Sequence, residues 1–146
     1  MAVTTFHLIR AFVHSIDEDI KRYQQLLDLL QQQKMLYFKF DEHTLSSIVS
    51  QQMAIIEQLS RSASERSQCI RKLGLPNNEQ SVYRIFNALP SRFKTQVREQ
   101  WSLLKLLVKE CQQMNRSNGQ SSAALYELIN QIKHPVQYTY EECLFY

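Results

Sequence analysis

Apolar residues recur every three or four positions through the first 30 residues of this chain. Such spacing places them on one face of an α-helix, whereas a strand would need alternation by two. The repeat consists of Phe6, Ile9, Val13, Ile16, Ile20, Tyr23, Leu27 and Leu30. It predicts one helix over residues 4–39, about 54 Å long at about 1.5 Å per residue. Phe12 and Leu26 widen the apolar stripe, which indicates contact with more than one neighbouring element.

A second periodic segment runs over residues 42–73, and its ends carry clear signals. Asp41 is a suitable N-cap, and Gly74 followed closely by proline is a typical stop. Polar residues interrupt the apolar register of this segment at Gln52, Ser62 and Arg66. The next residues predict a short connecting helix, which Asn78 can cap and Pro90 ends.

The last periodic segment predicts a helix over residues 92–133. Its register continues unchanged through Asn118-Gly119, a pair that is ordinarily a turn signal. Because a turn would usually break the phase, we favour one continuous helix. The alternative is a helix that ends near Arg116 and restarts at Ser121. Pro135 ends the helix in either case.

Composition supports a helical protein with few turns. The chain has 2 glycines and 3 prolines among 146 residues, which disfavours β-sandwiches, barrels and glycine-rich nucleotide sites. We therefore expect an all-α fold, an antiparallel bundle of three long helices with a short connecting helix between the second and third. The expected organisation is a single domain over residues 1–146, with the bundle in 1–133 and a C-terminal tail in 134–146.

The helix lengths do not match, so the last helix is expected to project beyond the others. Residues 122–133 would extend roughly 18 Å past the loop near Phe40. The apolar side chains with little expected cover there are Leu125, Leu128, Ile129 and Ile132. An exposed apolar patch usually marks a partner site. The alternatives are that these residues bury one another or close a homodimer.

Signals for catalytic or metal chemistry are absent from the sequence. It contains no nucleotide-binding or hydrolase motif, no Glu-x-x-His pair and no CxxC pair. His14 and Glu18 read as a surface pair rather than a metal site, Asp17-Glu18-Asp19 as a solvated face, and Cys111 as a small core residue. We expect no enzyme activity, cofactor or metal.

Charge and hydropathy exclude two further classes of partner. Eight Lys/Arg and two acidic residues lie between Arg61 and Arg98, but the segment has no recognition-helix pattern. We interpret it as a solvated end of the bundle and expect no nucleic-acid binding.

No stretch approaches the roughly 20 apolar residues of a membrane span. We therefore expect no membrane insertion and a cytoplasmic location.

The last third of the chain carries the most specific pattern. Its elements are Trp101, Cys111, Asn115-Arg-Ser-Asn118-Gly119, an amphipathic stretch to Ile132, and Tyr138 after a proline. This pattern resembles the FlgN family of flagellar export chaperones. Arg66 followed by Leu73-Gly74 fits the second helix of that family.

The resemblance implies a cytoplasmic chaperone without catalytic chemistry. Such proteins bind the hook-associated proteins of the hook–filament junction, prevent their premature assembly and deliver them to the flagellar type III export gate. The implied substrate-binding residues are Leu125, Leu128, Ile129, Ile132 and Val136. Tyr138, or alternatively Tyr140, is the implied contact with the export gate. The competing interpretation is another helical adaptor or secretion chaperone that acts through a dimerising helical surface.

Asn115, Asn118 and Gly119 form a polar seam just before the implied substrate-binding stretch. A buried asparagine can set the register of packed helices, as it does in coiled coils. Gly119, which lacks a side chain, would permit close approach of a neighbouring backbone at a cost of about 1 kcal/mol in helix stability.

Overall fold

A computed structural model describes residues 2–37, 39 and 41–118 of the 146-residue chain. The described part contains four α-helices and no strand. They are α1 (Ala2–Tyr37), α2 (Glu42–Lys72), α3 (Glu79–Asn87) and α4 (Ser91–Asn118). The prediction of an all-α fold is therefore confirmed for this part of the chain. The predicted continuation of the last helix over 119–133, its projecting end and the tail over 134–146 lie outside the described residues.

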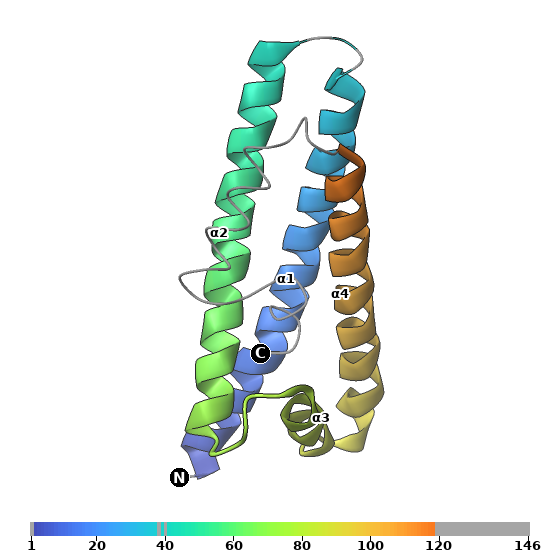
Figure 1. The fold of residues 1–146 in the computed structure, drawn as a ribbon. Coiled ribbons are helices and arrows are strands. Elements are labelled where there is room, and N and C mark those ends of the chain that lie inside the picture. The colour runs from blue at the N-terminus through green and yellow to red at the C-terminus, as the bar shows by residue number, and fades with distance from the viewer. Residues whose placement is uncertain (1, 38, 40, 119–146) are drawn as a thin grey trace.

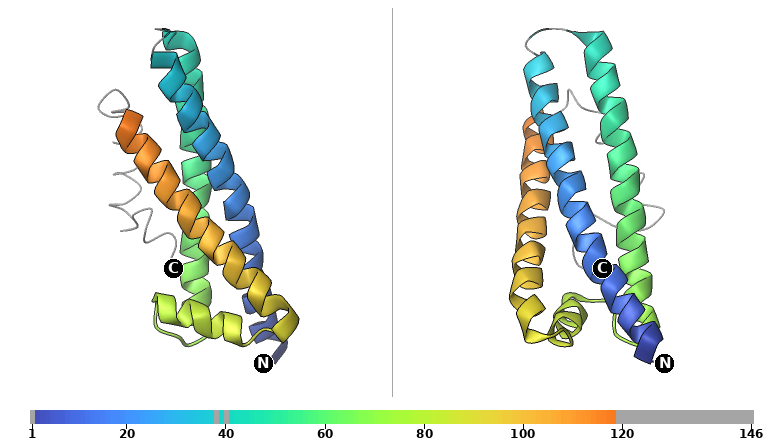
Figure 2. Two further views of the ribbon diagram at one scale, coloured as in Figure 1. Left: turned by 90° about the vertical axis from the view of Figure 1, so that its right-hand side faces the viewer. Right: turned by 180° about the vertical axis from the view of Figure 1, so that it is seen from behind.

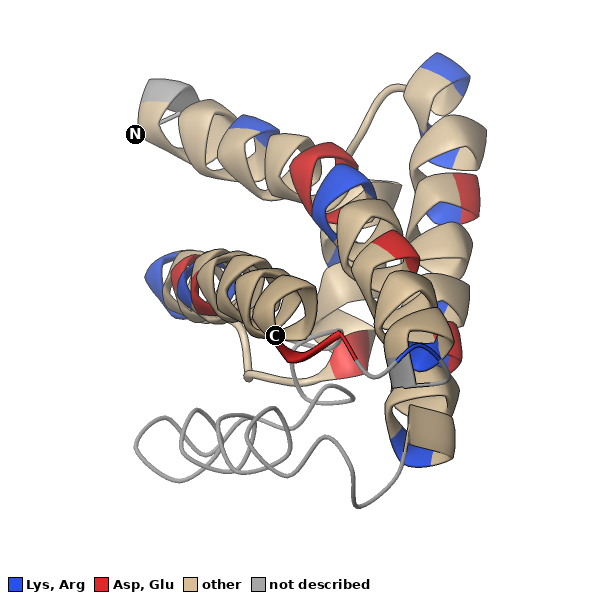
Figure 3. Ribbon diagram, turned by 90° about the horizontal axis from the view of Figure 1, so that it is seen from above, with Lys and Arg blue, Asp and Glu red and all other residues tan. Residues whose placement is uncertain are grey.

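Three long helices lie side by side, and α1 is in contact with both of the others. In Figure 1, α1 runs upward from the N-terminus, α2 returns downward, and α4 runs upward again beside α1. The short α3 lies across the lower end and leads into α4 (Figure 2). Most packing between helices joins α1 to α2 and α1 to α4. The view from above shows α2 and α4 on different sides of α1 (Figure 3).

The helix ends follow the predicted signals. The side chain of Asp41 accepts a hydrogen bond from the backbone N–H of Thr44 at 3.1 Å and caps α2. Asn78 caps α3 in the same way. At the end of α2, Gly74 has a φ of 76°, a left-handed conformation that glycine adopts without a Cβ penalty. Its N–H donates to the Arg71 carbonyl, which satisfies a carbonyl that the helix leaves unpaired.

The hydrophobic core runs along the inner face of α1 and confirms the wide apolar stripe. Phe12 and Leu26, which lie beside the predicted seam, are fully buried, because α1 packs against two helices. Phe6, the first residue of the seam, is 60% exposed. Near the lower end, the ring of Phe86 contacts both Phe12 and Trp101 edge-on. Edge-to-face aromatic pairs of this kind join α1, α3 and α4.

The expectation that Asp17-Glu18-Asp19 forms a solvated face is wrong for Asp19. The Asp19 carboxylate is fully buried, and its Oδ2 accepts a hydrogen bond from Nη1 of Arg66 on α2. Arg66 is also buried, although it belongs to the basic segment that we expected at a solvated end. The same Nη1 donates to Ser62 at 3.1 Å, and Arg22 donates to the second Asp19 oxygen at 2.8 Å. A buried carboxylate is tolerated here because charged donors satisfy both of its oxygens.

Cys111 occupies the core position that its spacing predicts, and this makes its thiol unreactive. The side chain is fully buried, and burial raises the pKa of the thiol to about 12. Since the thiolate is the reactive form, very little of it exists at pH 8 in the folded protein. In a Cys69→Ala/Cys143→Ala variant, we expect Ellman's reagent at pH 8 to modify Cys111 at least about 100-fold more slowly in buffer than in 8 M urea. Equal rates in the two solvents would contradict this placement.

Candidate functional site

The structure describes two of the residues that the sequence analysis assigned to function. Asn115 and Asn118 are both buried at the end of α4. The remaining assigned residues lie outside the described part of the chain. They are Gly119, Leu125, Leu128, Ile129, Ile132, Val136, Tyr138 and Tyr140.

Asn118 joins α4 directly to α1 and, through Gln33, to α2. Its Nδ2 donates to the backbone carbonyl of Leu30 at 3.0 Å and to Oε1 of Gln33 at 3.2 Å, both on α1. The same Gln33 oxygen accepts a hydrogen bond from Nε2 of Gln52 on α2 at 3.0 Å. We call Gln33, Gln52 and Asn118 the amide layer. It contributes one buried side chain from each long helix.

The amide layer fixes alignment rather than adding much net stability. Within the described residues, Oε1 of Gln52 and Oδ1 of Asn118 and of Asn115 are buried without a hydrogen-bond partner. Burying an unpaired polar atom costs free energy, so an all-apolar layer would pack more favourably. The hydrogen bonds of Asn118 are satisfied only when α4 is level with Leu30 and Gln33 of α1. The layer therefore favours the alignment in which Asn118 of α4 lies beside Leu30 and Gln33 of α1.

The heptad spacing predicts Asn118 in a polar seam, but it does not by itself predict that Gln33 and Gln52 are its neighbours. The available signal for Gln52 was that this polar residue interrupts the apolar register of its helix. Gln33 follows Leu30 by three positions and so continues the buried face of α1. That continuation could have identified it within the run of three glutamines.

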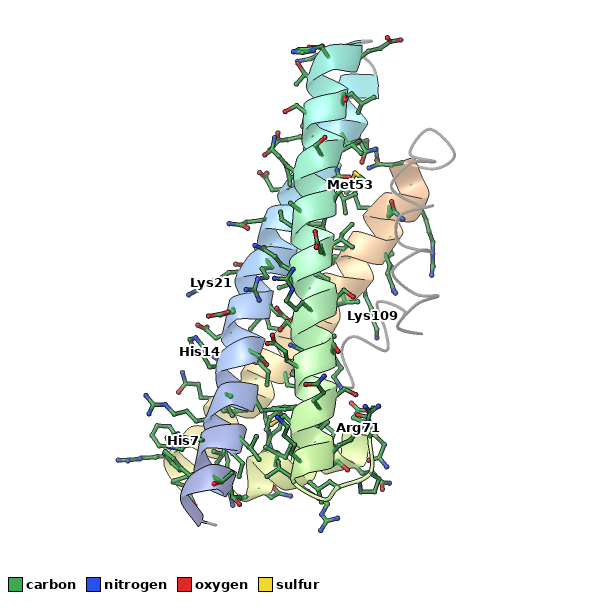
Figure 4. All side chains as sticks on the ribbon, turned by 90° about the vertical axis from the view of Figure 1, so that its left-hand side faces the viewer. His7, His14, Lys21, Met53, Arg71 and Lys109 are labelled. Atoms are coloured by element: carbon green, nitrogen blue, oxygen red, sulfur yellow. The ribbon has the colours of Figure 1, made fainter. Side chains whose placement is uncertain are left out.

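The polar side chains of the amide layer differ in chemistry from those on the exposed face of α1. The amide layer carries uncharged groups that neither take up nor release protons near neutral pH. His14 and Glu18 form the expected surface pair, with Nε2 and Oε1 2.8 Å apart and both side chains substantially exposed. His14 lies on α1 together with His7 and Lys21, at intervals of seven residues (Figure 4). No group of three His, Cys, Asp or Glu residues that could hold a metal occurs in residues 2–37, 39 and 41–118.

Comparison with known families decides what kind of protein this is. The family model described as "FlgN protein" matches residues 1–134, nearly the whole chain. The chain belongs to the FlgN family. The match includes the amide layer and the stretch from Leu125 to Ile132, and it ends before Val136, Tyr138 and Tyr140.

A solved structure shows the same fold. It is a crystal structure provisionally described as a flagella synthesis protein FlgN from Pseudomonas aeruginosa. The two chains superimpose with a TM-score of 0.71 at 21% sequence identity, over 82% of this chain and 93% of that one. No curated protein matches the sequence. Among the described residues of this FlgN-family chain, none of the helices combines the length and apolar character needed to span a bilayer.

Proposed function

We propose that this protein is a cytoplasmic flagellar export chaperone that binds hook-associated proteins, prevents their premature assembly and delivers them to the type III export gate. The match of the FlgN family model over residues 1–134 carries this proposal, because proteins of this family are chaperones of flagellum assembly. The fold of the Pseudomonas aeruginosa protein supports it at the level of architecture. The uncharged, buried character of the amide layer is compatible with a binding protein.

The proposed cargo surface follows the amide layer directly in the sequence. Leu125, Leu128, Ile129 and Ile132 are spaced at i, i+3, i+4 and i+7, a pattern that shares one face of a helix. An amphipathic segment of the cargo would dock on this face and hide the surface that it uses for assembly. Val136 would extend the same apolar contact.

The energetics of such a contact suit a chaperone that must also release its cargo. Burial of roughly 500 Å² of apolar surface contributes roughly 12 kcal/mol before costs, at about 25 cal/mol per Å². Ordering the cargo segment and losing its free motion remove much of this gain. The resulting affinity lies in the micromolar to nanomolar range. We assign delivery at the gate to Tyr138 or Tyr140, which follow the cargo residues in the sequence.

Substitution of the proposed cargo face tests this function. In Leu125→Asp/Ile129→Asp, two carboxylates would have to be buried on binding, so we expect affinity for hook-associated proteins to fall at least about tenfold. Titration calorimetry with a purified hook-associated protein measures the change. Leu103→Asp/Leu106→Asp is the matched control, because both leucines are on α4 and are already exposed to solvent.

Two results would contradict the proposal. One is unchanged cargo binding by the Leu125→Asp/Ile129→Asp variant while its circular dichroism spectrum stays that of the wild type. The other is a tight wild-type dimer in light scattering that these substitutions convert to monomer without any cargo binding by either form. The second result would assign the face to self-association.

A further inference from the structure

An apolar groove lies at the end of the molecule opposite the amide layer. It is lined by the first turns of α1, by the connection from α3 to α4 and by the first turns of α4. Its volume is about 640 Å³. We call it the corner groove. Its apolar lining includes Phe6, Ile9 and Val13 of α1, Leu89 between α3 and α4, and Phe93 and Val97 of α4.

The two walls of the corner groove have the periodicity of helix-binding surfaces. On α1 the lining residues Phe6, Ile9 and Val13 follow one another at intervals of three and four. On α4, Phe93 and Val97 show the same spacing. The wall on α1 extends from Phe6 to Asp17, about 17 Å at about 1.5 Å per residue. The apolar lining covers about two turns of α1 and about one turn of α4, at about 3.6 residues per turn, and such a trough accommodates a short segment of a third helix.

Large apolar side chains are left uncovered at this groove. Phe6 is 60% exposed and Phe93 is 41% exposed, while Val97 beneath them is buried. Exposed aromatic side chains beside an apolar floor are typical of surfaces that anchor a partner. Eight of the fourteen lining residues are apolar, so a partner that buries apolar surface fits this groove.

The charges at the rim of the groove are unbalanced. Within the described residues, Arg10 and Arg92 form no ion pair, and the guanidinium of Arg92 lies over the ring of Phe93 at 4.7 Å. The acidic residue of the lining, Asp17, is already paired with Lys21 at 3.5 Å. The rim therefore presents two uncompensated positive charges beside an apolar trough.

We propose that the corner groove binds an amphipathic helix of a partner protein that carries Asp or Glu beside its apolar face. Apolar side chains at i, i+3 or i+4, and i+7 would fill the trough between α1 and α4. The flanking carboxylates would pair with Arg10 and Arg92 at the rim. None of the residues that line the corner groove belongs to the proposed cargo residues. The inference does not depend on the identity of the cargo.

Two synthetic peptides of 14 residues test the proposal on the full-length protein. Both carry leucines at i, i+3, i+4 and i+7; one has glutamates and the other lysines at the flanking positions. Fluorescence anisotropy at about 50 mM salt measures binding. We expect a Kd of about 1–100 μM for the glutamate peptide and at least tenfold weaker binding of the lysine peptide. Absence of binding by the glutamate peptide at 1 mM, or equal affinity for both peptides, would overturn the proposal.

Charge reversal on the protein gives the decisive control. In Arg10→Glu/Arg92→Glu the rim becomes negative, so the preference should switch to the lysine peptide. Arg71→Glu/Lys109→Glu changes the net charge equally at exposed positions outside the groove (Figure 4) and should retain the wild-type preference. A preference that both variants change to the same extent would assign binding to net charge and refute the site.

Further variants test the apolar contacts of the corner groove and its independence from the proposed cargo face. Phe6→Ser/Phe93→Ser should weaken binding of the glutamate peptide about tenfold or more, whereas Leu103→Ser/Leu106→Ser should leave it unchanged. The Leu125→Asp/Ile129→Asp variant should bind this peptide like the wild type, whatever happens to its cargo affinity. Loss of peptide binding in that variant would place the peptide on the cargo face and contradict the corner groove as its site.

Discussion

Replacement of Trp101 by alanine is expected to lower the free energy of unfolding by about 3–5 kcal/mol, a range typical of Trp→Ala changes in cores. Trp101 is the single tryptophan of the chain and is fully buried. Its removal would leave a cavity between α4 and the elements that pack against it. A chain of this size has only about 5–15 kcal/mol of stability in total, so the effect is a large share.

The position of Trp101 explains why neighbouring residues would not compensate. Its ring meets Phe86 of α3 edge-on, with the centroids 6.0 Å apart, and Phe86 meets Phe12 of α1 at 6.4 Å. Phe86 is the ring shared by both contacts, so loss of Trp101 removes one support of packing that involves three helices. Relaxation into the cavity would have to move α3 and α4 together. Most of the cavity would therefore remain, and the loss in the free energy of unfolding would be large.

Urea denaturation followed by circular dichroism at 222 nm measures the Trp101→Ala effect without relying on tryptophan fluorescence. Leu106→Ala is the matched control on the same helix, because Leu106 is 52% exposed, and we expect its effect to stay within about 0.5 kcal/mol. Trp101→Phe should lose less than Trp101→Ala, since it retains an aromatic ring. A loss below about 1 kcal/mol for Trp101→Ala would contradict the packing described here.

Substitution of Arg66 by methionine is expected to destabilise the protein by about 3 kcal/mol, because it leaves the Asp19 carboxylate buried without its partner on α2. Arg22 still donates to the other Asp19 oxygen at 2.8 Å. We therefore expect a loss at the lower end of the about 3–5 kcal/mol that is typical when one partner of a buried ion pair is removed. Methionine fills a similar volume, so the effect reports the charge rather than a cavity.

A double-mutant cycle separates the charge effect from packing. In Asp19→Leu/Arg66→Met the uncompensated charge is gone, so we expect recovery of most of the stability that Arg66→Met loses. Arg22 retains Glu18 as a partner at 3.2 Å in that variant. Urea denaturation of the wild type, both single variants and the double variant gives the coupling. Additive losses would show that the two residues do not interact.

The sequence was sufficient to predict elements with strong local signals. The apolar repeat located α1, and Gly74 and Asn78 marked the end of α2 and the start of α3. Local chemistry determines such features, since a cap or a left-handed turn depends on a few adjacent residues. The all-α fold follows from them because long amphipathic helices must bury their apolar faces on one another.

The pairing of buried polar side chains between helices was not predictable, because the partners lie far apart in the sequence. Asp19 lies seven positions from both Phe12 and Leu26, so spacing could have placed it on the buried stripe, but the run of acidic residues does not show which cation pairs with it. Its partner Arg66 is 47 positions away and looked like an interruption of an apolar register. The same holds for the candidate site, where spacing placed Asn118 in a seam but could not identify Gln33 as its partner.

The placement of α1 between two partners also has a consequence for the order in which the chain can fold during synthesis. Asn118 and Leu30, which are hydrogen-bonded in the folded protein, are separated by 88 positions. At a translation rate of about 5–20 residues per second, roughly 4–18 s pass between the synthesis of Leu30 and the synthesis of Asn118. The face of α1 that packs against α4 has no native partner until α4 is made. A chaperone of flagellum assembly would thus itself pass through a stage at which its own first helix is only partly covered.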